Sequence, residues 1–155
     1  MIRKAIHADI HKMLELGEAM HDESRFVSVP WDTEKVGRLI TWLIDTDEGL
    51  ALVAERDGEI VGGFLGVVTE HYFSTEKMAQ DFALFVSPNR RGGLAGAQML
   101  GHFIAWARAL GVRDEWIQVG VTTGVDIEKT SRLCKAVGFQ PAGYLFALKE
   151  ALPCA

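Results

Sequence analysis

The chain has 155 residues, of which 16 are Lys or Arg and 21 are Asp or Glu, so its formal net charge is −5. This length is close to the commonest domain size, and we expect residues 1–155 to form a single domain. An acidic chain without a Lys/Arg cluster argues against a nucleic-acid partner, because neutralising phosphates requires a basic face. No apolar stretch approaches the ~20 residues of a membrane span, so no membrane partner is expected.

The cysteines and the N-terminal residues favour a cytoplasmic protein. Cys134 and Cys154 are too few for a disulfide scaffold or a four-ligand zinc site, and we expect both to be free thiols. Residues 1–7 lack the apolar run of a secretory signal. The histidines show no metal-ligand spacing, so no metal site is expected.

The first half of the chain predicts a strand, two helices and a hairpin. Apolar residues recur at helical spacing in two segments and at strand spacing in three. Asp57-Gly58, between two β-rich runs, is a strong hairpin signal. The predicted elements cover residues 2–6, 9–20, 32–49, 50–55 and 59–68.

The second half predicts three strands that alternate with two helices. After a loop around residues 70–79, the elements cover residues 81–86, 94–110, 116–121, 126–137 and 144–148. Gly111 and Gly138 stand just past the two helices, where a helix commonly ends. About four helices and six strands on one chain predict a mixed α/β domain with three layers.

Residues 86–96 carry the strongest chemical signal. A buried strand runs into a turn with the sequence Asn89-Arg90-Arg91-Gly92-Gly93, which opens a long helix. Free backbone N–H groups and the positive end of the helix dipole favour an anion at such a turn. The glycine spacing fits neither a Rossmann fingerprint nor a P-loop. Without further context, a plain loop is an equally good interpretation.

The context of that turn resembles the GNAT superfamily of N-acetyltransferases over nearly the whole chain. The resemblance rests on Val86-x-Pro88-x-x-Arg91-Gly92, on the long helix that follows, and on Val137-Gly138-Phe139 after the last helix. It implies a twisted, mostly antiparallel central sheet of about six to seven strands flanked by about four helices. Residues 20–24 and 90–93 are most similar to small acetyltransferases of phages and prophages.

The resemblance also implies acetyl-coenzyme A as cofactor, with its pyrophosphate on the turn. The family pattern fits from Arg90 or from Arg91, and we prefer Arg91 because it keeps the spacing to Pro88, although Leu94 then stands where Gly is usual. The pantetheine arm is expected along residues 82–86, where a backbone N–H near Phe85 or Val86 polarises the thioester carbonyl. The expected cofactor-binding residues are Phe85, Val86, Arg91, Gly92, Gly93, Leu94, Ala95, Gly96 and Ser131.

Acetyl transfer to an amine also calls for groups that move protons. Family members often place an acidic base or relay where Asp81 stands, and Cys134 occupies the position of a tyrosine that acts as general acid in many members. A solvated carboxylate and a small buried hydrophobe are the respective alternatives. The candidate catalytic residues are Asp81, Cys134, His21 and Glu23, with Glu70 and His71 as further candidates for the base.

The function implied is transfer of an acetyl group from acetyl-coenzyme A to a primary amine, by direct attack in a ternary complex. The acceptor is a small-molecule or peptide amine, and small members of the family often form homodimers. The rival hypothesis is a non-catalytic acyl-coenzyme A binding module or phage accessory protein. Cys134 and Leu94, which depart from the family pattern, motivate it.

Overall fold

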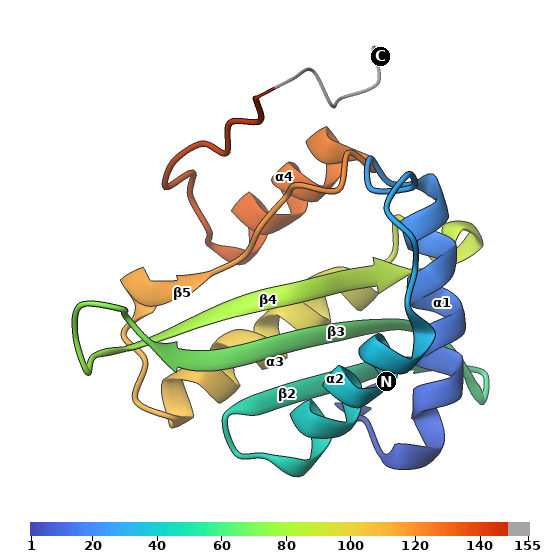
Figure 1. Cartoon of the computed structure of the whole chain (residues 1–155), viewed down its shortest axis with the longest axis horizontal. Coiled ribbons are helices and arrows are strands. Elements are labelled where there is room, and N and C mark those ends of the chain that lie inside the picture. The colour runs from blue at the N-terminus through green and yellow to red at the C-terminus, as the bar shows by residue number, and fades with distance from the viewer. Residues whose placement is uncertain (149–155) are drawn as a thin grey trace.

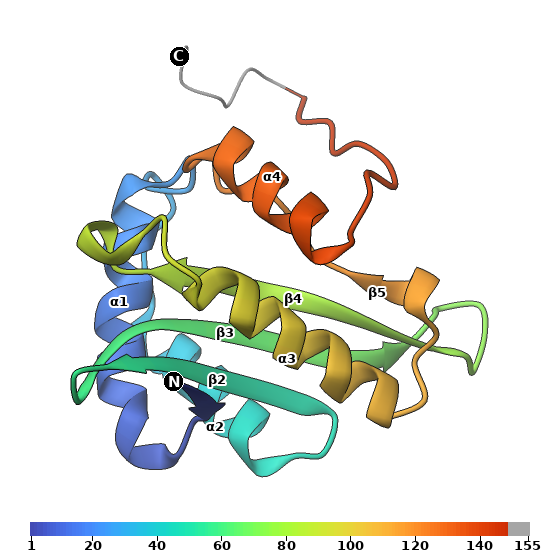
Figure 2. The same cartoon turned by 180° about the vertical axis from the view of Figure 1, so that it is seen from behind.

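A computed structural model describes residues 1–148 of the chain. One mixed sheet lies between two layers of helices, with α1 and α2 on one face and α3 on the other (Figures 1 and 2). The strands are β1 (Ile2–Lys4), β2 (Gly49–Arg56), β3 (Glu59–Glu70), β4 (Lys77–Val86) and β5 (Ile117–Gln118). The helices are α1 (Ile10–Glu23), α2 (Thr33–Asp45), α3 (Ala95–Ala109) and α4 (Ile127–Val137). This arrangement confirms the predicted mixed α/β domain with three layers.

The strands lie in the order in which they occur along the chain, β1-β2-β3-β4-β5. Neighbours are antiparallel except for the parallel pair β4–β5. The predicted hairpin joins β2 to β3, and its turn residues Asp57 and Gly58 have φ angles of 53° and 79°. Because Asn, Asp and Gly adopt such left-handed angles most readily, the Asp-Gly pair determines where the chain reverses.

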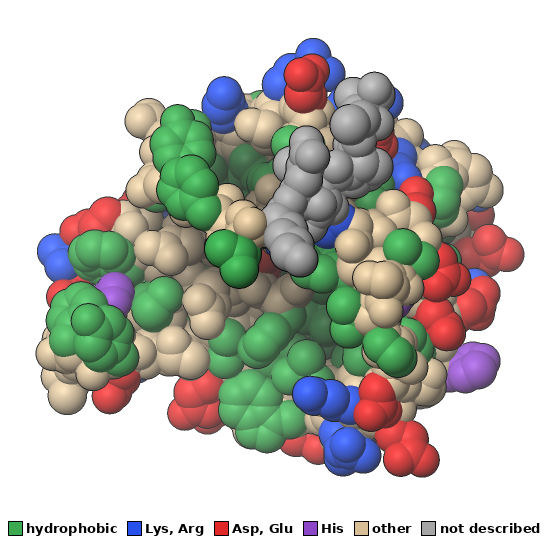
Figure 3. All heavy atoms as spheres, turned by 45° about the horizontal axis from the view of Figure 1, so that its top comes forward, with side chains coloured by type: hydrophobic (Ala, Val, Ile, Leu, Met, Phe, Trp, Pro, Cys, Tyr) green, Lys and Arg blue, Asp and Glu red, His purple; other side chains and the backbone are tan. Residues whose placement is uncertain are grey.

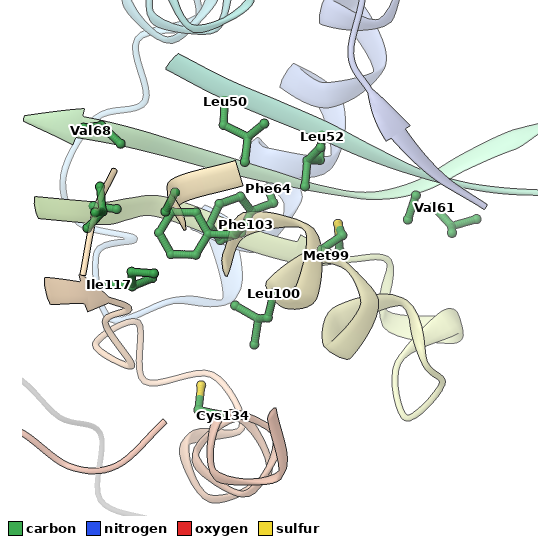
Figure 4. Close-up of a cluster of buried hydrophobic side chains, with 14 residues drawn as sticks. Leu50, Leu52, Val61, Phe64, Val68, Met99, Leu100, Phe103, Ile117 and Cys134 are labelled. Carbon is green, nitrogen blue, oxygen red and sulfur yellow. The ribbon is translucent and has the colours of Figure 1, made fainter. Parts of the chain in front are cut away.

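Two hydrophobic cores form because alternate residues of each strand point to opposite faces. Between the sheet and α3, the rings of Phe64 and Phe103 pack with centroids 4.8 Å apart (Figure 4). Between the sheet and the other two helices, Val53 packs with Met13 of α1 and Leu43 of α2. The sheet is thus shielded from water on both faces over its central strands.

Strand β4 contains a bulge at Phe82. Leu65 of β3 pairs with Ala83 and the next residue, Gly66, pairs with Asp81, so Phe82 has no partner. One extra residue reverses the alternation of side chains. Ala79 therefore lies in the core beneath α3, whereas Phe85 lies in the core beneath α1 and α2. The side chain of Phe82 remains 51% exposed.

The prediction of six to seven strands was wrong, because the described residues form five. The strand expected over 116–121 is limited to β5, and residues 144–147 form no strand although their sequence favours one. Side chains in this last segment, such as Tyr144 and Phe146, lie almost fully exposed. A β-rich sequence becomes a strand only where a neighbouring edge pairs with it. The predicted free thiol of Cys154 lies outside the described residues.

The loop expected over 70–79 is shorter than predicted. Strand β3 continues to Glu70 and β4 begins at Lys77, which leaves only residues 71–76 for the connection. The backbone N–H of His71 donates to the carbonyl of Glu76 across this turn (3.0 Å). Among residues 1–148, no helix is long and apolar enough to cross a membrane.

Candidate active site

A cleft opens where β4 and β5 separate. The two strands pair only through Ala79 and Gln80, so the outer edge of β4 is unpaired from Asp81 onward. The cleft has a volume of about 580 Å³. Its lining residues come from the second half of β4, the loop that enters α3, the segment after β5, and α4. In Figure 3, which brings the top of Figure 1 forward, Lys and Arg side chains lie along the upper edge, over α4.

The loop between β4 and α3, residues 87–94, has the features of an anion site and is called the anion loop below. Gly92 has a φ of +83°, a conformation that other residues rarely adopt. No side chain caps the N-terminus of α3, so its first backbone N–H groups keep no side-chain partner. A side chain at Gly96 would meet Leu133 of α4 at 2.9 Å, so this glycine permits close packing of the two helices. The cations that line the cleft are Arg90, Arg91, Lys129 and Arg132.

The edge of β4 determines which backbone groups face the cleft. The N–H of Ser87 donates to the Val61 carbonyl of β3 at 2.8 Å. Alternation in an antiparallel ladder then directs the N–H of Phe85 toward β3 and those of Leu84 and Val86 toward the cleft. Arg91 Nε accordingly reaches the Val86 carbonyl at 3.1 Å from the cleft side. Of the two predicted thioester contacts, Val86 presents its backbone to the cleft, whereas Phe85 is bound into the sheet.

Asp81 and Cys134 lie in this cleft together. Asp81 stands directly before the bulge and accepts a hydrogen bond from the N–H of Gly120 (2.8 Å). Burial raises the pKa of Asp81, although the hydrogen bonds to its carboxylate oppose that effect. Cys134 is 7% exposed, and its pKa is raised first by burial and then by the charge of Asp81. The cysteine therefore remains a thiol at neutral pH.

His21 and Glu23 do not join Asp81. Both carboxylate oxygens of Glu23 bind the guanidinium of Arg91. The His21 ring packs against Trp31, with centroids 5.4 Å apart, and His21 Nδ1 and Trp31 Nε1 are buried without a hydrogen-bond partner. The proposed catalytic residues thus separate into a pair inside the cleft and a pair at the end of α1.

The remaining candidates divide between the cleft and other places. Glu70 and His71 do not line the cleft, and His71 instead packs edge-on against Trp116. The predicted cofactor residues Gly92, Gly93, Ala95 and Gly96 line it, whereas Leu94 points mostly to solvent. On α4, the neighbours of Ser131 form the lining rather than Ser131 itself. No group of three His, Cys, Asp or Glu side chains within residues 1–148 is arranged to hold a metal ion.

Sequence reasoning did not anticipate the segment between β5 and α4. Residues 119–123 line the cleft opposite β4, and Gly120 binds Asp81. The run Gly120-Val121-Thr122-Thr123-Gly124 between an apolar strand and a helix was the available signal, because small residues permit close approach to a ligand. The strand predicted over 116–121 includes only Gly120 and Val121 of this run.

The model of the family described as "Acetyltransferase (GNAT) family" matches residues 16–139, which include β2 to β5, the anion loop and α4. The chain belongs to the GNAT family. The match covers every segment of the cleft described above. No curated protein sequence matches the chain.

Solved structures share the GNAT fold across nearly the whole chain. An integron cassette protein from the mobile metagenome of the Cole Harbour salt marsh has a TM-score of 0.74 at 21% identity, covering 99% of this chain and 91% of its own. An aminoglycoside antibiotic 6'-N-acetyltransferase from Acinetobacter haemolyticus scores 0.73 at 14% identity, with 97% of each chain covered. A predicted acetyltransferase with acetyl-CoA from Clostridium acetobutylicum scores 0.72 at 16% identity, covering 96% and 95%. At these identities the likeness concerns the fold.

Proposed function

We propose that this GNAT protein transfers an acetyl group from acetyl-coenzyme A to a primary amine by direct attack in a ternary complex. The observation that carries the proposal is the unpaired edge of β4, which runs from Asp81 directly into the anion loop. An extended chain that ends in a diphosphate matches this arrangement of an open strand edge followed by a cationic, glycine-rich turn. The described residues therefore fit acetyl-coenzyme A.

Each part of the cleft has a chemical role in this reaction. The N-terminus of α3 and the side chains of Arg90, Lys129 and Arg132 hold the phosphates by charge and backbone N–H groups. The cofactor supplies an acetyl group activated as a thioester. Backbone N–H groups at the open edge, those of Leu84 and Val86, are the donors available to stabilise negative charge on the carbonyl oxygen.

Asp81 is the proposed base. The amine nitrogen forms a bond to the thioester carbon, the carbon–sulfur bond breaks, and the proton lost by the nitrogen passes to the Asp81 carboxylate. A carboxylate with a raised pKa accepts a proton near neutral pH better than an ordinary aspartate. The hydrogen bond from Gly120 holds the carboxylate in the cleft.

Cys134 is proposed as a packing residue rather than as the general acid. Its raised pKa makes it a poorer proton donor, and its side chain belongs to the core beneath α3. A coenzyme A thiol has a pKa of about 8.5 on the free-cysteine scale, so the thiolate leaves without an enzymic donor. The chemistry then does not depend on the missing tyrosine.

The acceptor is proposed to be a small-molecule or peptide amine. Because a protein of the same fold is an aminoglycoside N-acetyltransferase, aminoglycosides belong in the first panel of amines, beside polyamines and peptide N-termini. We further propose a place near the acetyltransferases of phages and prophages, supported by the sequence of residues 20–24 and 90–93.

Titration calorimetry with acetyl-coenzyme A tests the cofactor part of the proposal. We expect one-to-one binding by the wild-type protein and loss of binding in Arg91→Glu. Arg38→Glu is the matched control, because it makes the same change of charge on the surface of α2, outside the cleft. A folded wild-type protein that does not bind acetyl-coenzyme A contradicts the proposal.

A panel of amines, followed by release of free thiol, tests the transfer. Turnover of at least one amine supports the enzyme. Saturable cofactor binding without turnover of any amine supports the rival, a non-catalytic acyl-coenzyme A binding module.

A further inference from the structure

The guanidinium of Arg91 is bound by the protein itself on several sides. Its Nε donates to the Val86 carbonyl (3.1 Å), its Nη1 to Glu23 (3.1 Å) and its Nη2 to the other oxygen of the same carboxylate. The Asp126 carboxylate lies 4.0 Å from Nη1. A fork of two parallel N–H donors facing two oxygens is the geometry that Arg also offers to a phosphate. Glu23 thus takes the position relative to Arg91 that a phosphate takes.

Glu23 is ionised in this contact. The hydrogen bond and charge of Arg91 hold the pKa of Glu23 below its usual range. The pair is moderately shielded from water, with 25% of the Arg91 side chain and 36% of the Glu23 side chain exposed. A second anion at Arg91 would therefore face a full negative charge at short range, and repulsion of like charges disfavours holding both.

Glu23 comes from α1, an element far in sequence from the anion loop that carries Arg91. It is the last residue of α1, and the loop after β4 lies beside that end of the helix in Figures 1 and 2. Two residues later, the Arg25 backbone N–H donates to the carbonyl of Thr123 (2.8 Å) and Arg25 Nε donates to that of Thr122 (2.6 Å). Both threonines line the cleft. The Glu23–Arg91 pair therefore joins the end of α1 to the anion loop, and Arg25 joins the same end to the segment after β5.

We propose that Glu23 is a positioning residue that occupies Arg91 in competition with the cofactor phosphates, so that cofactor binding frees the Glu23 side chain at the end of α1. This inference rests on the proposed function, since it concerns the same cofactor. It also gives Glu23 a role different from that of a catalytic base. The carboxylate lowers cofactor affinity. It also couples occupation of the anion loop to the position of the end of α1.

Glu23→Gln tests the competition, because it keeps the shape of the side chain and removes its charge. By calorimetry we expect coenzyme A and acetyl-coenzyme A to bind about two- to fivefold more tightly than to the wild type, an amount typical of one partly exposed ion pair. In steady-state kinetics, KM for acetyl-coenzyme A falls while kcat does not rise. The matched control is Asp22→Asn, the same change one residue earlier on a carboxylate whose side chain is 72% exposed and which makes no contact with Arg91.

A charge swap distinguishes competition from a purely structural role. Glu23→Arg combined with Arg91→Glu restores the ion pair in reverse, so its thermal stability should exceed that of either single variant. Cofactor binding should still be lost, because the anion loop then carries a carboxylate. Unchanged or weaker binding in Glu23→Gln, together with normal binding by the wild type, overturns the inference and leaves the proposed function intact. Absence of binding by the wild type overturns both.

Discussion

The two halves of β4 show how one strand serves both stability and chemistry. Over Lys77–Gln80 the strand pairs with β3 on one edge, and Ala79 and Gln80 pair with β5 on the other. Over Asp81–Val86 it keeps β3 but has no strand on its outer edge. The change falls at the bulge, where a single extra residue interrupts the ladder. The first half completes the sheet, and the second leaves backbone groups free to bind a ligand.

The largest effect is expected on the reaction rate, from Asp81→Asn in the half of β4 that has no outer partner strand. Loss of a base typically lowers the rate by about 10²- to 10⁴-fold, and asparagine keeps an oxygen for the N–H of Gly120. Measurement of kcat/KM against pH checks this. In the wild type the rate falls as the pH drops through the raised pKa of Asp81, because the protonated acid accepts no proton. A profile with the same acid limb in the variant contradicts the assignment.

The same substitution has the opposite effect on stability. Because burial raises the pKa of Asp81 in the folded protein, the wild type loses stability as the pH rises from about 3.9 through that raised value. Asparagine carries no charge and removes this loss. We therefore expect Asp81→Asn to melt at the same or a higher temperature than the wild type at pH 7. A clearly lower melting temperature would show that the carboxylate stabilises the fold.

Ile117 of β5 pairs with the first half of β4, and Ile117→Ala tests whether β5 stabilises the sheet. Ile117 is buried and packs in the core beneath α3, and truncation of a buried isoleucine costs about 2–5 kcal/mol. Urea titration followed by circular dichroism measures the loss. Below its melting temperature the variant should bind acetyl-coenzyme A like the wild type, because Ile117 does not line the cleft. An equal loss of stability and affinity would mean that the two halves are not separable.

Cys134→Ala is expected to have a smaller effect. Removal of one buried sulfur atom should lower the free energy of unfolding by about 1 kcal/mol, by analogy with one buried methylene. If Cys134 only packs, kcat stays within about threefold of the wild type. A fall of 10² or more in kcat, without loss of the fold, would restore the role of general acid.

Phe82→Ala should change stability least. Its side chain is 51% exposed at the bulge, and substitutions at exposed positions usually stay within about 0.5 kcal/mol. Thermal melting of this variant beside Ile117→Ala compares a residue of the bulge with a residue of the closing strand. A loss as large as that of Ile117→Ala would show that the ring, and not only the extra backbone unit, maintains the change in alternation.

The fold could largely be predicted because its signals are local. Helical periodicity, the Asp57-Gly58 turn and Gly138 after α4 each act on residues close in sequence, and Gly138 indeed ends the helix with a φ of 118°. The predictions of strands over 116–121 and 144–148 were largely wrong, because the signals there are not local. Residues 144–148 have the composition of a strand, but pairing depends on an edge that lies elsewhere in the fold.

The site could be predicted where backbone conformation specifies the chemistry, as at Gly92, and less well where side chains must meet. The spacing of the anion loop identifies its glycines and arginines, whereas nothing in the sequence shows that Arg91 binds Glu23, which lies 68 positions earlier. The bulge was equally hidden, because residues 81–86 are mostly apolar and give no alternation from which the direction of Phe85 could be inferred.

The extra residue in β4 makes the length of that strand as important as its composition. Deletion of Phe82 would turn either Ala79 or Phe85 from its core toward the wrong layer, since a shift of one residue exchanges the two faces of a strand. Relatives of this protein should therefore keep the number of residues between the turn at 71–76 and the anion loop while the residues themselves vary. Insertions and deletions should instead gather in that exposed turn, where a change of length leaves both cores in phase.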